Sequence, residues 1–246
     1  MMKQKYIWLM LSVLLGACTS QMHRYDPAQV DASSQRSLQN NQVSAEQKLG
    51  TRWGDDISSN SYQVDLKRVS SRPLDETSIR YADKHYDGRS INSISLVAGK
   101  VSFSVVDDRG QTIPLYRDGQ NYYLSARNGQ SYQLKYNNHS AQTFEIVASV
   151  DGLDVLNGRQ ASRSNSGYVI RPHSTLAIEG FRKSANAVAS FTFSKPGDAY
   201  AANSSQGSIQ NTGVIGTVVY ELNAPVSRTA PTTQYAPPPN AFPGDR

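Results

Sequence analysis

The sequence predicts an all-β protein: an antiparallel, jelly-roll-like β-sandwich of about nine strands with disordered N- and C-terminal tails. Three observations lead to this fold class. Apolar and polar residues alternate in several short runs, a period typical of half-buried strands. Turn dipeptides separate these runs. Tyrosine, which favours strands, is abundant, with 14 Tyr against 6 Phe and 2 Trp.

The strands are expected within residues 57–223. The clearest alternation places Phe144, Ile146, Ala148 and Val150 on one face of a strand. The same period of two occurs in five other runs, namely Tyr62-Val64-Leu66, Val101-Phe103-Val105, Tyr132-Leu134-Tyr136, Ala189-Phe191-Phe193 and Gly216-Val218-Tyr220-Leu222. A short helix is expected near residues 45–49, and residues 195–212 are expected either to hold a short helix near residues 198–202 or to act as a flexible flap. The sequence leaves open whether residues 57–92 belong to the sandwich or wrap around it.

Tight turns are expected between these strands, because Gly after Asp or Asn supplies the positive φ that short hairpins need. The dipeptides concerned are Asp87-Gly88, Arg109-Gly110, Asp118-Gly119, Asn128-Gly129, Asp151-Gly152 and Asn157-Gly158. Their close spacing, with no helical period between them, favours a sandwich over a fold with helices between strands.

The first seventeen residues have the pattern of a secretory signal peptide. Lys3 and Lys5 precede a ten-residue stretch, residues 6–15, that is apolar apart from Ser12. A membrane-spanning helix needs about 20 apolar residues, so this stretch is too short for one. The alternative is a buried core helix, which the basic start and the polar sequence that follows disfavour.

Leu15-Gly16-Ala17-Cys18 resembles the lipobox of bacterial lipoproteins, and Cys18 is the single cysteine of the chain. The resemblance implies cleavage before Cys18, thioether lipidation of its sulfur and acylation of the new amino terminus. Thr19, rather than Asp, follows the cysteine, which in that class favours the outer membrane. We therefore expect a membrane partner through the Cys18 lipid and a domain that faces the periplasm. Several acyl chains anchor a protein stably, whereas one binds marginally.

Two polar segments flank the expected domain. Residues 18–56 are rich in Gln, Asn and Ser and poor in large apolar residues, which predicts a flexible tether. Residues 224–246 contain six prolines and predict a disordered tail, either a docking segment or a solvated terminus. Removing Lys3 and Lys5 lowers the formal net charge from +5 to +3, and no segment forms a basic stripe. No nucleic-acid partner is therefore expected.

The segment 128–222 resembles a β-domain that recurs in uncharacterised exported bacterial proteins. The resemblance rests on four short stretches, at residues 150–155, 167–170, 178–182 and 188–191. It implies a β fold and carries no activity with it.

No catalytic, metal or cofactor motif is evident. The four His residues lack zinc-binding spacing, and there is no G-x-S-x-G elbow. Asp151, Asp154 and Glu179 are the central acids, yet Asp151 and Asp154 lie in or beside a turn, where Asp caps its own backbone, and Glu179 is expected on the polar side of a strand. Catalytic residues, metal and cofactor are accordingly assigned as none, and the protein is expected not to be an enzyme.

Four residues are candidate ligand or partner contacts: Asp151, Asp154, Tyr168 and Arg182. Asp151 and Arg182 could pair, either as contacts on one rim or as a structural charge pair. Five tyrosines could stack on sugars or on a partner, although packing in the core or an interface is favoured for them. These are Tyr122, Tyr123, Tyr132, Tyr136 and Tyr168.

Three functions follow from these patterns. The preferred one is a non-catalytic outer-membrane lipoprotein whose periplasmic β-domain binds another envelope protein or assembly. The alternative, a glycan- or peptidoglycan-binding module, predicts a row of exposed aromatic side chains on one sheet face. A second alternative, an envelope hydrolase, predicts a concave pocket in which at least two titratable groups touch.

Overall fold

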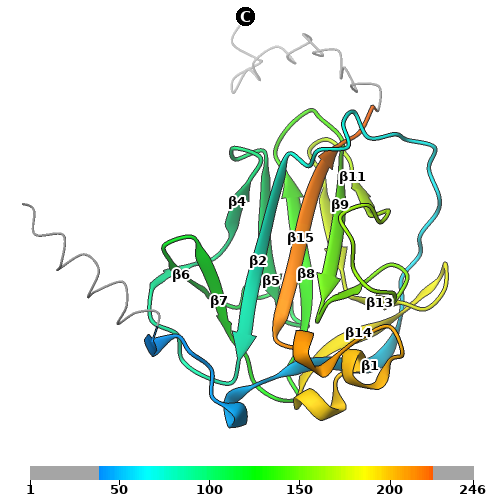
Figure 1. The fold of residues 1–246 in the computed structure, drawn as a ribbon. Helices are drawn as coiled ribbons and strands as arrows, with labels where there is room; N and C mark the ends of the chain where they lie inside the picture. The colour runs from blue at the N-terminus through cyan, green and yellow to red at the C-terminus, as the bar shows by residue number, and fades with distance from the viewer. Residues whose placement is uncertain (1–38, 224–246) are drawn as a thin grey trace, which may run out of the picture. The chain divides into compact units, whose positions relative to one another are not determined.

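The computed structural model describes residues 39–223, and Figure 1 draws the remaining residues as a grey trace. The predicted signal peptide, Cys18, most of the predicted tether and the Pro-rich tail thus lie outside the described residues. Within them, two β-sheets pack face to face, which confirms the all-β sandwich.

The first sheet has seven strands in the order β1-β14-β8-β5-β4, with β12 paired to β8 and β13 to β14. Its strands are β1 (Gly50–Ser58), β4 (Ile94–Leu96), β5 (Val101–Val106), β8 (Ser131–Asn138), β12 (Thr175–Ile178), β13 (Gly180–Arg182) and β14 (Ala187–Ser194). The short helices η2 (Pro196–Asp198) and α2 (Tyr200–Asn203) follow β14, where the sequence predicts a short helix or a flap, and contact β1.

The second sheet has eight strands in the order β10-β9-β15-β2-β7-β6-β3, with β11 paired to β9. Its strands are β2 (Asp75–Ala82), β3 (Arg89–Ile91), β6 (Leu115–Asp118), β7 (Asn121–Ser125), β9 (Phe144–Val150), β10 (Leu153–Asp154), β11 (Tyr168–Ile170) and β15 (Val214–Glu221). The helix η3 (Ile209–Asn211) precedes β15, and η1 (Ala45–Gln47) precedes β1 near the predicted helix at 45–49.

The strand count and one pairing differ from the prediction. The described residues form fifteen strands rather than about nine, and five of these have only two or three residues, too few to show alternation. The pair β2–β7 is parallel, whereas the sequence predicts antiparallel pairing throughout. A parallel pair needs a long connection, and β3 to β6 lie in the chain between these two strands.

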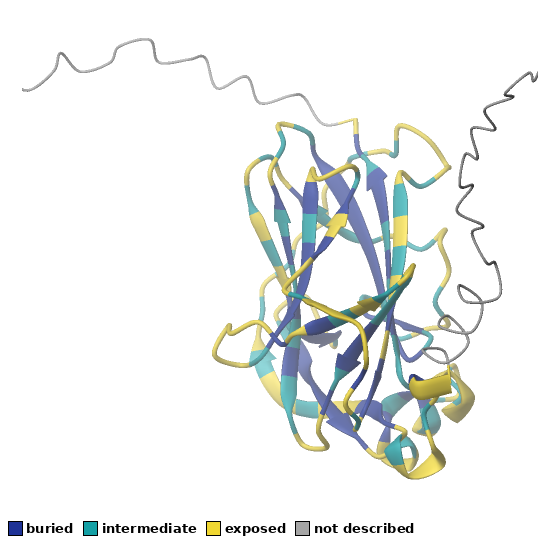
Figure 2. Cartoon of the chain, turned by 90° about the vertical axis from the view of Figure 1, so that its left-hand side faces the viewer, coloured by how far each residue is buried: buried dark blue, intermediate teal, exposed yellow. Residues whose placement is uncertain are grey.

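The core lies between the facing sheets, where the alternating residues are buried (Figure 2). Aromatic side chains dominate it, and the rings of Tyr132 and Phe193 stack with centroids 4.1 Å apart. Phe103 stacks on Tyr136 at 4.6 Å in the same way. In β9 the predicted inward face is buried, but Glu145 and Val147 on the other face are buried too, so burial does not alternate along this strand.

The predicted turns are confirmed by backbone geometry. Each glycine of the six dipeptides has a positive φ. In Asp151-Gly152 both residues do, with φ of +54° and +77°, and this turn joins Val150 to Leu153 at the start of the β9–β10 hairpin.

The predicted tether, residues 18–56, is wrong where it overlaps the described residues. Strand β1 begins at Gly50 and pairs with β14 from Gly50–Ser194 to Ser58–Ala187. This edge strand shows no alternation, because only its first two residues are buried and a bulge interrupts it between Trp53 and Asp56. A strand without a buried face has no signature in the sequence.

The predicted strand at Tyr62-Val64-Leu66 is also wrong. Residues 59–74, which we call the arch, lie outside the strands and cross from β1 to β2. Figure 1 shows the arch in cyan, running up beside the sandwich and over its top. Residues 57–92 therefore divide, since the arch wraps around the sandwich while β2 and β3 belong to it.

Candidate functional site

Asp151, a predicted contact residue, is fully buried inside a hydrogen-bond network. Its carboxylate accepts from the Tyr81 hydroxyl at 2.6 Å, the Thr51 N–H at 2.6 Å and the Gly213 N–H at 2.8 Å. The Thr51 hydroxyl in turn bonds the hydroxyls of Tyr81 and Tyr132. The network joins strands of both sheets, so Asp151 holds the sandwich together and offers no free atom to a ligand.

The environment of Asp151 affects its ionisation in two opposing ways. Burial raises the pKa of the Asp151 carboxyl to about 6, although hydrogen bonds from Tyr81, Thr51 and Gly213 act to lower it. Burial also raises the pKa of Tyr81 and Tyr132 well above the usual value, and the nearby Asp151 carboxylate adds to the effect. Both tyrosines are therefore neutral hydrogen-bond donors.

The predicted contact between Asp151 and Arg182 is wrong. The Arg182 guanidinium donates instead to the Tyr168 hydroxyl at 3.0 Å and to the backbone carbonyl of Ser59. Its charge also lies 5.6 Å from the centre of the Tyr168 ring. The structure thus brings two of the four predicted contact residues together, where they fasten the start of the arch to β11 and β13.

Asp154 is buried and caps its own turn, as the turn interpretation predicts. One carboxylate oxygen accepts the N–H groups of Leu156 and Asn157, at 2.8 Å and 3.0 Å. The other accepts from the Asn165 side chain at 2.9 Å. These bonds use Asp154 to shape the loop after β10, so it is not available to a partner.

The packing interpretation of the five tyrosines fits their burial. Tyr123, Tyr132 and Tyr136 are buried, while Tyr122 and Tyr168 are half-buried and pack against the core. The two exposed aromatic residues among the large hydrophobic ones described are Trp53 on β1 and Tyr62 on the arch. The row of exposed aromatic rings that a glycan-binding module predicts is not seen on either sheet within residues 39–223.

A groove of about 940 Å³ opens on the described surface. Its floor runs over the outer face of β2, β15 and β9, where Ser78, Gly216 and Ser149 form one cross-strand row. β4 and the start of β7 border it. The lining holds two acidic side chains, Asp75 and Glu76, and two basic ones, Arg80 and Arg163.

The rim of the groove is held in a costly backbone conformation. Val97 and Ala98, in the turn between β4 and β5, both have a φ of +51°. A left-handed conformation costs an L-residue about 1–2 kcal/mol, and a β-branched residue such as Val rarely adopts it. The Val97 N–H donates to the Asp75 carboxylate at 2.7 Å, so β2 holds this turn at the groove. Strain of this kind is common at functional sites.

A second hollow lies beside His85 and Tyr116 and is also lined by Asp83 and Ser125. The Ser125 hydroxyl is buried without a hydrogen-bond partner in the structure. Among the described residues no hydrogen bond joins this serine to His85 or Asp83, so they do not form the nucleophile–base contact of a hydrolase. Asp151, Asp154 and Glu179 line neither the groove nor this hollow.

The arch carries most of the exposed apolar surface. Of the six large hydrophobic residues that are exposed within residues 39–223, four lie on it. Their exposed fractions are 75% for Tyr62, 39% for Val64, 61% for Val69 and 46% for Leu74. A concentration of this kind marks an interaction surface more often than scattered single residues do.

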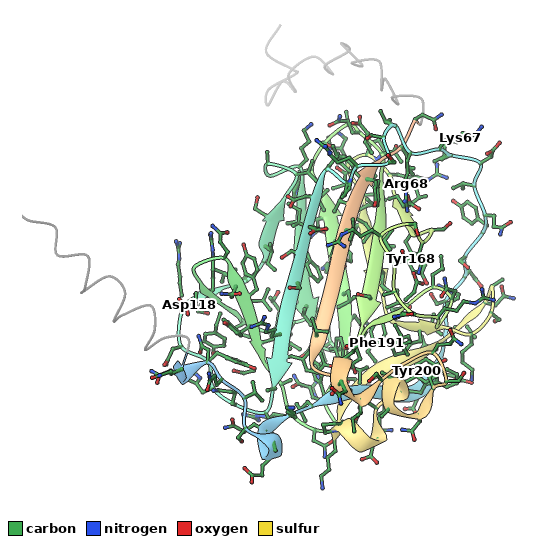
Figure 3. The ribbon with its side chains drawn as sticks, in the orientation of Figure 1. Lys67, Arg68, Asp118, Tyr168, Phe191 and Tyr200 are labelled. Atoms are coloured by element: carbon green, nitrogen blue, oxygen red, sulfur yellow. The ribbon has the colours of Figure 1, made fainter. Side chains whose placement is uncertain are left out.

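The arch is nevertheless firmly attached. Arg68, at its crest in Figure 3, donates to the Glu145 carboxylate at 2.6 Å and lies 3.7 Å from the centre of the Tyr220 ring. Lys67 exchanges hydrogen bonds with Asn223. The N–H groups of Val69 and Leu74 add backbone bonds to the carbonyls of Glu221 and Val219, so these contacts fix the second half of the arch against β15.

Two features are absent from the part of the chain that the structure describes. No group of three His, Cys, Asp or Glu side chains lies close enough to hold a metal ion. No helix in residues 39–223 is long and apolar enough to span a membrane.

Comparison with known proteins found no match for the chain among protein-family models, curated proteins or solved structures. The candidate surfaces therefore rest on their own geometry.

The sequence left open whether residues 57–92 wrap around the sandwich, but it identified neither the bounds of the arch nor the groove. The alternation at Tyr62-Val64-Leu66 signals a strand with a buried face, whereas the tertiary structure leaves Tyr62 and Val64 exposed. The groove residues give no signal, because Ser78, Ser149 and Gly216 are ordinary strand residues until three strands bring them together. The loop-type clusters at residues 58–61 and 70–73, rich in Ser, Asn and Pro, are the signal that could have indicated an irregular segment here.

Proposed function

We propose that this chain is a non-catalytic lipoprotein, anchored in the outer membrane through Cys18 and facing the periplasm, whose β-sandwich binds another envelope protein. The observation that carries the proposal is the arch, a segment with four exposed apolar side chains that is held to the sheet by the part-buried Arg68–Glu145 ion pair. The lipobox-like sequence before Cys18 supports the membrane anchor. The candidate acids also support a non-catalytic role, because the carboxylates of Asp151 and Asp154 are both buried and accept hydrogen bonds from other groups of the chain.

The test is a pull-down of the lipidated full chain from envelope extracts in mild detergent. The variant Tyr62→Ser/Val69→Ser removes the two most exposed side chains of the arch. Ile209→Ser is the matched control, since Ile209 is 51% exposed on η3, outside the arch. We expect a stoichiometric protein partner that is lost with the arch variant and kept with the control.

Two further forms separate the remaining alternatives. Cys18→Ala removes the lipid and should release the chain from the membrane fraction while leaving the partner contact intact. A form without residues 224–246 tests whether the Pro-rich tail is the docking segment. Retention on cell-wall material, with no protein partner, would reject the proposal in favour of glycan binding.

A further inference from the structure

Strand β2 has a ladder partner on both sides only in its middle. Residues 75–80 pair with β15, and Ile79 to Ala82 pair with Tyr122 to Ser125 of β7, so the two ladders overlap at Ile79 and Arg80 alone. Residues 75–78 have β15 as their only ladder partner within the described chain. In Figure 1, β2 and β7 meet at their lower ends and separate upward, and the groove occupies this region.

The separation follows from the turn that starts β7. Asp118 and Asn121 pair across a tight turn whose Gly119 has a φ of +59°. The Asn41 side chain donates to the Asp118 carboxylate at 3.3 Å, which fastens the turn to the start of the described chain. Asp118 accordingly lies well away from β2 in Figure 3. The groove therefore occupies the position beside residues 75–78 where a neighbouring strand would otherwise lie.

The edge of β2 that borders the groove carries free backbone groups. The Tyr81 N–H bonds the Gly213 carbonyl, and in an antiparallel ladder this places the amides of Glu76 and Ser78 on the side away from β15. An independent bond agrees, because the Glu76 N–H donates to the Asp75 carboxylate, which also binds Val97 across the groove rim. The Glu76 carbonyl and the Ser78 N–H remain to face the groove.

These two groups match one chemical class of ligand. In a parallel ladder, the carbonyl of one residue and the N–H of the residue two positions later both bond a single residue of the added strand. The charges of the lining balance, since the acidic Asp75 and Glu76 are matched by the basic Arg80 and Arg163. Glu76 is paired with Arg163, and Asp75 accepts from backbone amides. Extended polypeptide offers alternating N–H and C=O groups and is recognised in this way at free sheet edges.

We propose that the groove binds an extended segment of a polypeptide, which adds to the free edge of β2 opposite Thr77. This goes beyond the proposed function because no residue of the arch lines the groove, although the two surfaces adjoin at Leu74 and Asp75. Its test uses purified protein and defined probes, so that either proposal can fail alone. A partner bound at the arch would leave the groove free to bind a second polypeptide segment.

The experiment measures binding of a fluorescent peptide, acetyl-Thr-Val-Ser-Val-Thr-amide, to the full chain in mild detergent. The second probe is the same peptide with N-methyl groups on alternate residues. It keeps the side chains and lacks the N–H donors along one edge of the extended peptide. We expect the N-methylated peptide to bind about tenfold more weakly, the effect of losing one backbone hydrogen bond. Chitotetraose serves as the saccharide probe and should not compete.

Two protein variants locate the site. Ser78→Pro removes the groove-facing N–H without touching the β15 ladder, and should weaken peptide binding about tenfold. Ser78→Ala is the matched control, since it keeps the N–H and removes only the hydroxyl, and should bind as the unchanged chain does. If the proline variant does not fold, the difference in affinity between the two peptides for the unchanged chain still tests the proposal.

Three outcomes would overturn the proposal. They are equal binding of the two peptides, loss of binding in Ser78→Ala, and binding of chitotetraose in place of the peptide. The last would identify the groove as a saccharide site instead.

Discussion

The two ends of β2 use polar groups in opposite ways. At its C-terminal end, the Tyr81 hydroxyl is buried and bonds both Thr51 and Asp151. At its N-terminal end, residues 75–78 border an open groove, and the Ser78 N–H faces that groove. Polar groups bonded inside the chain specify the fold, while groups left open can recognise a partner. The same strand thus serves stability at one end and, as we propose, binding at the other.

The largest loss of stability is expected at the buried, C-terminal end of β2, where Tyr81 bonds Asp151. Asp151→Ala leaves the Tyr81 hydroxyl and the N–H groups of Thr51 and Gly213 without a partner inside the protein. We expect the free energy of unfolding at pH 7 to fall by about 3–4 kcal/mol, measured by urea denaturation. In the control Asp107→Ala, the lost hydrogen bonds are exposed, and the cost should stay near 1 kcal/mol. Equal losses would contradict the comparison.

The pH dependence of stability tests the same residue without removing its oxygen. Burial raises the pKa of Asp151 to about 6, above the unfolded value of about 3.9. Because the folded pKa is the higher one, the stability contributed by protonated Asp151 is present below about pH 4 and is lost as the pH rises through about 6.

The expected signal is the stability of the unchanged chain minus that of Asp151→Asn. It should fall between pH 4 and pH 7 by up to about 3 kcal/mol, because one pKa unit corresponds to about 1.4 kcal/mol. Urea denaturation across this pH range measures it. A difference that is constant or grows with pH would show that folding does not raise the pKa of Asp151.

A smaller effect is expected where the arch meets the sheet. Arg68→Met leaves the largely buried Glu145 carboxylate without its ion-pair partner and frees the crest of the arch. We expect a loss of about 2–3 kcal/mol, with faster limited proteolysis within residues 59–74. Lys183→Met is the control, because its pair with Asp56 is exposed and should be worth less than about 1 kcal/mol.

The smallest effect is expected at the open end of β2. Ser78 is exposed, and its hydroxyl makes no hydrogen bond within the described residues. Ser78→Ala should therefore change the free energy of unfolding by less than about 0.5 kcal/mol, as surface substitutions commonly do. A loss of 2 kcal/mol or more in urea denaturation would show that the groove edge is part of the stabilising structure.

Local signals in the sequence predicted the features that depend on a few neighbouring residues. The turn at Asp151-Gly152 needs only its own two positive φ angles, and the sequence identifies it by residue type. The alternation at Phe144, Ile146 and Val150 likewise reports a buried face, and all three are buried. The role of Asp154 as a turn cap was also predictable, because its partners Leu156 and Asn157 are close in sequence.

Long-range contacts decided what the sequence could not predict. The bond from Thr51 to Asp151 joins residues 100 positions apart, and it turns a surface-type turn residue into a buried one. Strand β1 exists because β14 pairs with it, not because residues 50–58 have a strand pattern. Arg182 likewise meets Tyr168 and Ser59 rather than Asp151 because of where β13 lies in the sheet.

By itself, then, the sequence determined the β-sandwich class and the turns, because φ preferences and side-chain periodicity act within a few residues. The tertiary structure alone decided which polar groups are buried and which stay open. Burial and pairing depend on segments that meet only after folding, as the arch over Glu145 and the parting of β2 from β7 both show.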